Sequence, residues 1–236
     1  MRLKDDCTTD ETIPILQGFK LDGNGHTITA LAPESGEFEG AVIVNEGTVA
    51  RVRELKITTG DLESEGCDGS LSGINFDGAS GGIRKVKIDR IRRPAELDCQ
   101  DGAAIVVEDR VGVGTFKINI VNNELTRYQK TGIEVYDPTV KVEIKRNKIK
   151  GAGPTDQIVQ NGIQVSFGAR AVIEKNVIRN NNYTENETKA CGIIIFQTAN
   201  VTLGKQDRRN TFSGNNQNIC RPGGGSNSLG AERLVR

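Results

Sequence analysis

Short runs in which apolar and polar residues alternate return along the chain at a nearly constant interval. The stretch "KTGIEVYDPTVKVEIKRNKIKG", residues 130 to 151, contains two such runs, and "QNGIQVSFGARAVIEKNVIRN" repeats the same plan thirty residues later. Glycines open the repeats at positions 40, 73, 102, 132, 162 and 192, in steps of 33, 29, 30, 30 and 30 residues. A period of this size indicates a solenoid.

The alternation predicts what each repeat contains. Ile133 and Val135 point to one side with Glu134 and Tyr136 on the other, which is the pattern of a half-buried strand. Each repeat is expected to hold two or three short strands, and coils stacked about 4.8 Å apart would share one apolar core. We therefore predict an all-β solenoid of about six to seven coils. Ile133, Ile163 and Ile193 should form one buried file.

Asparagines mark one corner of the repeat. Asn123, Asn147 and Asn176 each stand two positions before an apolar residue. Asparagine tolerates left-handed backbone angles at sharp corners, and stacked asparagine amides can hydrogen-bond along the axis of a solenoid. We predict such a ladder, and the alternative is three unrelated loop asparagines.

The repeats, together with the opening "LDGNGHTI" at residues 21 to 28, resemble the single-stranded, right-handed parallel β-helix of pectate lyases, polygalacturonases and many secreted proteins. The resemblance covers about residues 13 to 220 and implies the fold more than an activity. The paired aspartates and Gly-His-Gly of polygalacturonases are missing, and the sole histidine is His26. Of the Asp-Pro-His-Asp motif of related epimerases, only Asp137 and Pro138 remain.

The organisation is that of one domain. We expect residues 1–20 to form an N-terminal cap that leads into the first coil, residues 21–220 the β-helix, and residues 221–236 a flexible or capping tail. No apolar run reaches eighteen residues, which predicts no membrane insertion. With 31 basic and 31 acidic residues the formal charge is zero, which argues against nucleic acid as the partner.

Five cysteines bear on the compartment. Cys67 and Cys99 fall in loops that enter equivalent strands of adjacent coils, and Cys191 and Cys220 lie about one turn apart. Because the stacking distance suits a disulfide, we predict the bridges Cys67–Cys99 and Cys191–Cys220, which leave Cys7 free or paired elsewhere. Such bridges favour a secreted, extracellular protein whose signal peptide has been removed. The alternative is a cytosolic protein with five reduced thiols.

Candidate binding residues come from the side of the sheet that faces solvent. In the enzymes that the chain resembles, substrate lies along the outward face of the first strand of successive coils. Alternate residues give a first outward row of Ile43, Asn75, Ala104, Glu134, Gln164 and Ile194, and a second of Asn45, Asp77, Val106, Tyr136, Ser166 and Phe196. Asp77, Glu134, Tyr136 and Gln164 are therefore the predicted carbohydrate-binding residues. An ordinary solvated sheet face is the alternative.

Two acidic loops suggest a metal. "DLESEGCDG" and "AELDCQDG" bring Asp68, Asp98 and Asp101 to neighbouring coils, and calcium prefers oxygen ligands of this kind. A lyase acting on polyuronates needs a cation against the substrate carboxylate and a base. Calcium with Lys130 or Arg127 as the base would supply both, whereas solvated loops would supply neither.

Basic residues suggest a second surface. The segments "IRKVKIDRIRRP" and "VKVEIKRNKIK" would stack cations up one side of the column. This ribbon would attract an anionic glycan, unless Asp89, Glu143 and Glu174 on adjacent coils neutralise it by pairing.

Two functional classes follow. The first is an extracellular β-helix module that binds a polysaccharide or a cell-surface glycan, without a complete catalytic set. The second is a calcium-assisted polysaccharide lyase acting on a polyuronate. Function must be argued from a site, because the fold alone hosts many activities.

Overall fold

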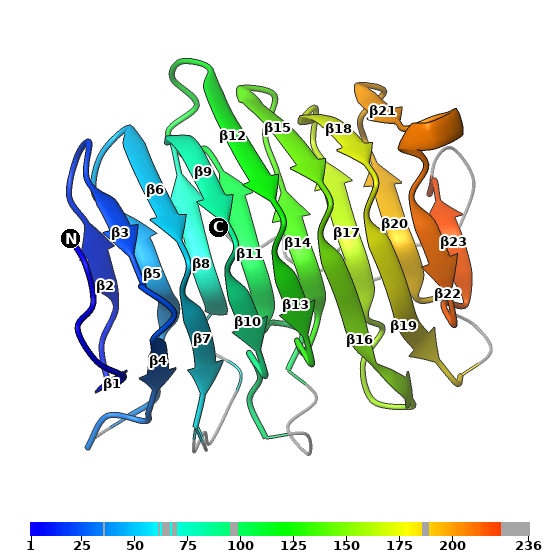
Figure 1. Ribbon diagram of the computed structural model, residues 1–236. Helices are drawn as coiled ribbons and strands as arrows, with labels where there is room; N and C mark the ends of the chain where they lie inside the picture. Colours follow the sequence, from blue (N-terminus) through cyan, green and yellow to red (C-terminus); the bar gives the residue numbers. More distant parts are fainter. Residues whose placement is uncertain are drawn as a thin grey trace.

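The computed structural model of the protein describes residues 1–34, 36–60, 62, 67, 70–94, 99–185 and 189–222. Within these ranges the chain winds into a parallel β-solenoid with three sheets, and each turn adds one strand to each sheet (Figure 1). Every strand pairing among the described residues is parallel, which confirms the predicted all-β solenoid.

Sheet 1 takes the first strand of each coil. Its strands, in order along the column, are β2 (Ile13–Ile15), β5 (Gly40–Asn45), β8 (Leu71–Asp77), β11 (Ala103–Glu108), β14 (Thr131–Val135), β17 (Asn161–Ser166), β20 (Cys191–Phe196) and β23 (Gln217–Cys220).

Sheet 2 takes the second strand of each coil. Its strands are β3 (Lys20–Asp22), β6 (Val49–Arg53), β9 (Ser80–Arg84), β12 (Phe116–Val121), β15 (Val140–Lys145), β18 (Arg170–Glu174) and β21 (Val201–Leu203). Seven strands in the described ranges make six steps, so the column has about six full turns, at the lower end of the predicted number.

Sheet 3 closes each coil. Its strands are β1 (Cys7–Thr9), β4 (Thr27–Ala30), β7 (Lys56–Thr59), β10 (Lys87–Asp89), β13 (Glu124–Thr126), β16 (Lys148–Thr155), β19 (Val177–Tyr183) and β22 (Thr211–Ser213). A 3-10 helix, Gln206–Arg208, separates β21 from β22. None of the described residues belongs to a helix long and apolar enough to cross a membrane.

The core consists of aliphatic files that run the length of the column. Ile133, Ile163 and Ile193 pair in register and are fully buried, as predicted. Equivalent files line the other two sheets, with Ile144 and Ile173 in sheet 2 as an example. Each coil thus buries side chains that its own short strands could not cover.

The predicted glycine anchors are wrong at Gly40 and Gly102. The register places Val42 and Ala104 opposite the glycines of neighbouring coils. Consequently Ile43 and Ala104, expected to face outward, are fully buried. The first outward row is Val44, Asn75, Val106, Glu134, Gln164 and Ile194, and the second contains Asp77, Glu108, Tyr136, Ser166 and Phe196.

The asparagine ladder is present at the corner between sheets 2 and 3. The side-chain amide of Asn123 donates to Asn147 Oδ1 over 3.0 Å, and that of Asn147 donates to Asn176 Oδ1 over 3.0 Å. Asn210, which was not predicted, continues the ladder by accepting from Asn176 over 2.9 Å. A second, shorter ladder joins Asn181 to the next coil.

The two predicted end segments are residues 1–20 and residues 221–236. Residues 1–20 contribute β1 and β2 to the ends of sheets 3 and 1, so they form part of the first coil. The strands extend to Cys220, and nearly all of the predicted tail lies outside the described residues.

Candidate functional site

Three of the four predicted carbohydrate-binding residues lie together on the outward face of sheet 1. Glu134 of β14 and Gln164 of β17 pair in register, and Tyr136 follows β14 directly. The Gln164 side-chain amide donates to the Tyr136 hydroxyl over 3.3 Å. A carboxylate, an amide and a phenol therefore meet on two adjacent coils, and this is a combination of groups that can hydrogen-bond hydroxyl groups of a ligand.

Asp77, the fourth predicted residue, is engaged by the protein itself. It ends β8 and lies two coils from Tyr136, about 10 Å along the axis. Arg110 Nε donates to Asp77 Oδ2 over 2.7 Å, and this contact raises the pKa of the Arg110 guanidinium. Glu108, beside Asp77 in register, accepts from Asn75 over 2.8 Å. The sequence prediction did not include Glu108, because the register error placed Val106 in its row, or Arg110, which lies in the loop after β11.

An aromatic cluster forms the next part of this face. Tyr136, Phe167 and Phe196 come from successive coils, with ring centroids 6.0 Å apart for the first pair and 5.6 Å for the second. The second pair meets edge to face, at an interplanar angle of 86°. All three side chains are half-buried. The sequence reading found Tyr136 and Phe196 but missed Phe167, which occupies the corner after the strand.

Phe167 holds an unusual backbone conformation. Its φ is 53°, in the left-handed region that bulky residues rarely adopt. Asp137 and Gln197 take positive φ at the same corner of the neighbouring coils, at 77° and 50°. Short polar residues adopt left-handed backbone angles more easily at such a corner. A phenylalanine there adds conformational strain that the turn itself does not require. The conformation places the ring between Tyr136 and Phe196.

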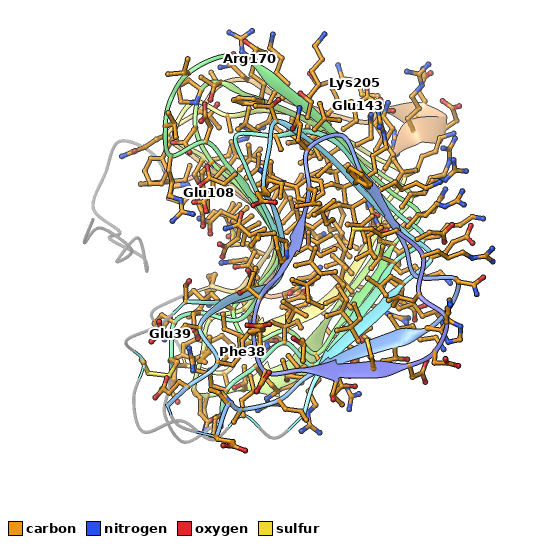
Figure 2. All side chains as sticks on the ribbon, turned by 90° about the vertical axis from the view of Figure 1, so that its left-hand side faces the viewer. Phe38, Glu39, Glu108, Glu143, Arg170 and Lys205 are labelled. Atoms are coloured by element: carbon orange, nitrogen blue, oxygen red, sulfur yellow. A yellow bond between two sulfur atoms is a disulfide. The ribbon has the colours of Figure 1, made fainter. Side chains whose placement is uncertain are left out.

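A raised loop borders the same corner. Residues 109–115 are tied down by Asp109, whose N–H donates to Asp137 Oδ2 over 3.0 Å and whose Oδ2 accepts from Thr139 over 2.7 Å. At its tip Val111 and Val113 are 78% and 70% exposed. In Figure 2 the outline is recessed on the side where Glu108 lies. The loop that carries these apolar side chains is thus anchored to Asp137, the residue after Tyr136.

The predicted calcium site stays a prediction, because only one of its three ligands lies within the described residues. Asp68 and Asp98 lie outside those residues, and Asp101 Oδ2 accepts from Arg93 Nε over 3.0 Å. Arg93 is fully buried and also pairs with Glu37 over 2.9 Å. Across the described ranges, no three His, Cys, Asp or Glu side chains gather as metal ligands would. Asp101 instead helps to neutralise a buried guanidinium, which would otherwise be costly.

The two predicted bases, Arg127 and Lys130, also hydrogen-bond to other residues of the protein. Arg127 Nε donates to Asp89 Oδ1 over 2.8 Å, and the pair raises the pKa of Arg127 while it lowers the pKa of Asp89. An arginine whose protonated form is stabilised in this way is a poor base. Lys130 Nζ donates to Gln100 Oε1 over 2.5 Å. This geometry speaks against Arg127 as the base, and the role of Lys130 stays a prediction.

Pairing neutralises part of the predicted basic ribbon. Lys145 Nζ lies 2.9 Å from Glu143 and 3.9 Å from Glu174. Lys85 lies 3.2 Å from Glu54 on the coil before it. Lys85–Glu54 and Lys145–Glu174 are pairs between coils, as the sequence allowed, whereas Lys145–Glu143 lies within β15.

Both predicted disulfides are present. Cys67 joins Cys99 and Cys191 joins Cys220, with Cα atoms 5.3 and 6.0 Å apart. Cys7 is exposed and is not part of a disulfide. Two cystines are typical of proteins that reside in an oxidising environment.

A cavity of about 580 Å³ opens at the C-terminal end of the column. Leu203, Phe212 and Ile219 line it, and these are the last members of the three aliphatic files. Among the described residues the cavity lies at the C-terminal end of the core, and Lys205 and Arg209 also line it.

The comparisons with known proteins agree with this architecture. A protein-family model described as a right handed beta helix region matches residues 72–229, more than half of the 236 residues. No curated protein matches the chain, and no solved structure matches it.

Proposed function

Because the chain belongs to the family of right-handed β-helix regions, we propose that it is an extracellular, non-catalytic module that binds a glycan along the outward face of sheet 1. The proposal depends on the aromatic cluster of Tyr136, Phe167 and Phe196. Half-buried rings offer apolar faces against which sugar rings can pack, and aromatic side chains with a few polar groups are typical of ligand sites.

Polar groups beside the rings would fix the orientation of the sugar. Gln164 and the Tyr136 hydroxyl already hydrogen-bond to each other, and Glu134 lies next to Gln164 in register. Gln164 and Tyr136 have further donor or acceptor capacity for sugar hydroxyls, whereas Glu134 is only 7% exposed. The strained backbone of Phe167 supports the proposal, because such strain is concentrated at functional sites. Because equivalent positions recur on successive coils, this face suits a polymeric ligand with a repeating unit.

The alternative of a calcium-assisted lyase has less support from the described residues. Arg127 is bound to Asp89 and Asp101 to Arg93, so neither is poised for a substrate. The two disulfides support an extracellular location for the module.

The experiment compares retardation of the protein by soluble glycans in affinity electrophoresis, with xylan, mannan, β-glucan and polygalacturonate as probes. We expect retardation by at least one of them, and a loss of affinity of about tenfold for Phe167→Asn, since one aromatic contact contributes about 1.4 kcal/mol. Asparagine tolerates the left-handed corner, so this variant removes the ring and keeps the backbone.

Phe19→Asn is the matched control, because Phe19 is 49% exposed and lies outside the aromatic cluster. Retardation by none of the four glycans, or equal retardation of wild type and Phe167→Asn, would overturn the proposal. Release of unsaturated products from polygalacturonate, abolished by a chelator, would instead support the lyase.

A further inference from the structure

Three cations stand in one line on the outward face of sheet 2. Lys117 of β12 pairs in register with Lys141 of β15, which in turn pairs with Arg170 of β18. Lys141 lies between two buried residues of its strand, and Lys117 and Arg170 each precede a buried residue, so all three side chains point away from the core. Adjacent members are one strand spacing apart, about 4.8 Å. We call this set the cation line.

The cation line differs from the charges that pair between coils. Lys85 and Arg127 pair with carboxylates of neighbouring coils. Within the described residues, no member of the cation line takes part in an ion pair. Like charges directly opposite each other on neighbouring strands are destabilising, so the fold gains nothing from this arrangement.

A carboxylate on the same face is already paired with another cation. Glu143 stands two residues after Lys141 on the same face of β15, and it lies 2.9 Å from Lys145. Glu174 on the next coil is shared between Lys145 and Arg208. The positive charge of the cation line is therefore not cancelled by its neighbours on sheet 2.

We propose that the cation line binds an anionic polysaccharide that lies along the axis of the solenoid. A polymer with a carboxylate or sulfate on successive sugars presents charges in a row, which is what three cations at one strand spacing complement. The line is one residue wide, and its neighbouring row of Asn119, Glu143 and Val172 contains a carboxylate and no aromatic ring. These features disfavour nucleic acid, whose binding relies on broad positive surfaces or on stacking platforms.

This surface is separate from the aromatic cluster. Figure 2 shows Arg170 on a different side of the cross-section from Glu108, which belongs to the outward face of sheet 1. The inference stands on the cation line alone and does not require that sheet 1 binds a glycan. A failure of one proposal leaves the other intact, because the variants that test them lie on different sheets.

The experiment measures binding to immobilised heparin as a function of salt. The triple variant Lys117→Gln, Lys141→Gln, Arg170→Gln should lose at least about tenfold in affinity. The slope of log affinity against log salt should fall by about one for each cation removed, because each one releases a counterion. The matched control is Lys56→Gln, Lys148→Gln, Arg179→Gln on sheet 3, which removes the same charge from exposed positions that do not form a line.

Lys141→Glu separates binding from folding. The new carboxylate would lie between Lys117 and Arg170, which should raise the melting temperature by about 1 to 4 °C while heparin binding falls. Equal loss in the control triple, or unchanged binding in Lys141→Glu, would overturn the proposal. Binding of single-stranded poly(dT) as tight as that of heparin would overturn the assignment to a polysaccharide.

Discussion

Asn147 shows how one side chain can connect three coils. Its Oδ1 accepts from both the backbone and the side-chain N–H of Asn123, and its amide donates to the carbonyl of Ile120 and to Asn176. The side chain is fully buried. Every donor and acceptor of the amide is thereby used, which a buried amide needs if it is not to weaken the fold.

Replacing Asn147 with alanine should lower the free energy of unfolding by about 3 kcal/mol or more. The change leaves the backbone N–H and one side-chain N–H of Asn123 buried without their acceptor, and each such group costs about 1 to 3 kcal/mol. Urea denaturation with the disulfides intact measures the effect. Asn119→Ala, on an exposed position of β12, is the control and should stay within about 0.5 kcal/mol of wild type. Equal losses in the two variants would contradict the role of the ladder.

Tyr128 links stability to pH at the alkaline end. Its side chain is fully buried, and burial raises the pKa of the phenol well above the ordinary value, although its hydrogen bond to Asn181 lowers the pKa somewhat. In the unfolded chain a tyrosine ionises near pH 10. The folded state keeps a proton that the unfolded state loses, so this stability is complete below about pH 10 and declines above it.

We therefore expect the Tyr128 phenolate to form only as the protein unfolds. Tyrosinate absorbance and far-UV circular dichroism, followed together as pH rises, test this, with Tyr128→Phe as the reference that lacks the group. The difference between wild type and variant in tyrosinate absorbance should coincide with the loss of β signal. A difference that develops while the β signal is unchanged would contradict it.

At the scale of the strand, the close stacking of coils restricts which residue fits. Gly81 of β9 has a φ of +145°, and a Cβ there would lie 1.8 Å from the carbonyl oxygen of Ala50 in β6. Gly82, its neighbour, has no such φ, and its Cβ would lie 3.2 Å from the carbonyl oxygen of Asn119. The same strand therefore contains one glycine that is required and one that is nearly replaceable.

Gly81→Ala should destabilise the protein by about 2 kcal/mol or more, because backbone of β6 or β9 must move to admit the methyl group. Gly82→Ala should cost less than about 1 kcal/mol. Thermal unfolding of the two variants under the same conditions compares them. Similar melting temperatures would mean that β6 and β9 separate more easily than their close contact implies.

Strand alternation was the most reliable guide in the sequence. A buried isoleucine file leaves a period of two within each strand and a period of thirty between coils, so the file through Ile133 and the corner at Asn147 could both be read. The register between coils was harder to predict. The close approach of neighbouring coils defines the column of positions that contains the repeat glycines, and residues other than glycine can occupy it. Ala104 occupies that column on its coil, so the register predicted from the nearby Gly102 was wrong there.

The candidate site was less predictable than the fold. Asn210 was missed because the 3-10 helix before it stretches the step from Asn176 to 34 residues. The pairing of Arg127 with Asp89 depends on which long side chains meet across coils, and repeat spacing does not specify that. Phe167 was missed for a related reason, since nothing in a repeat pattern predicts a bulky ring at a left-handed corner.

At the scale of the whole molecule, each coil contacts mainly the coils before and after it. Stability in such a column is close to a sum over neighbouring interfaces, so the ends open more easily than the middle. The disulfide Cys191–Cys220 joins β20 to β23, the last strand of sheet 1 in the described ranges. It therefore acts where the column has the fewest neighbours.

Removing that bridge should loosen the C-terminal end more than the centre. In Cys191→Ala, Cys220→Ala, a loop of 29 residues is released, which corresponds to about 3 to 4 kcal/mol of loop-closure stabilisation. Hydrogen exchange followed by mass spectrometry should show faster exchange across residues 191–220 and little change across 103–150. The matched variant Cys67→Ala, Cys99→Ala releases a loop of similar length nearer the other end of the column, so its faster exchange should fall on β8 and β11. Uniform acceleration along the chain in both variants would show that the coils unfold as one unit, and that the position of a bridge matters less than its presence.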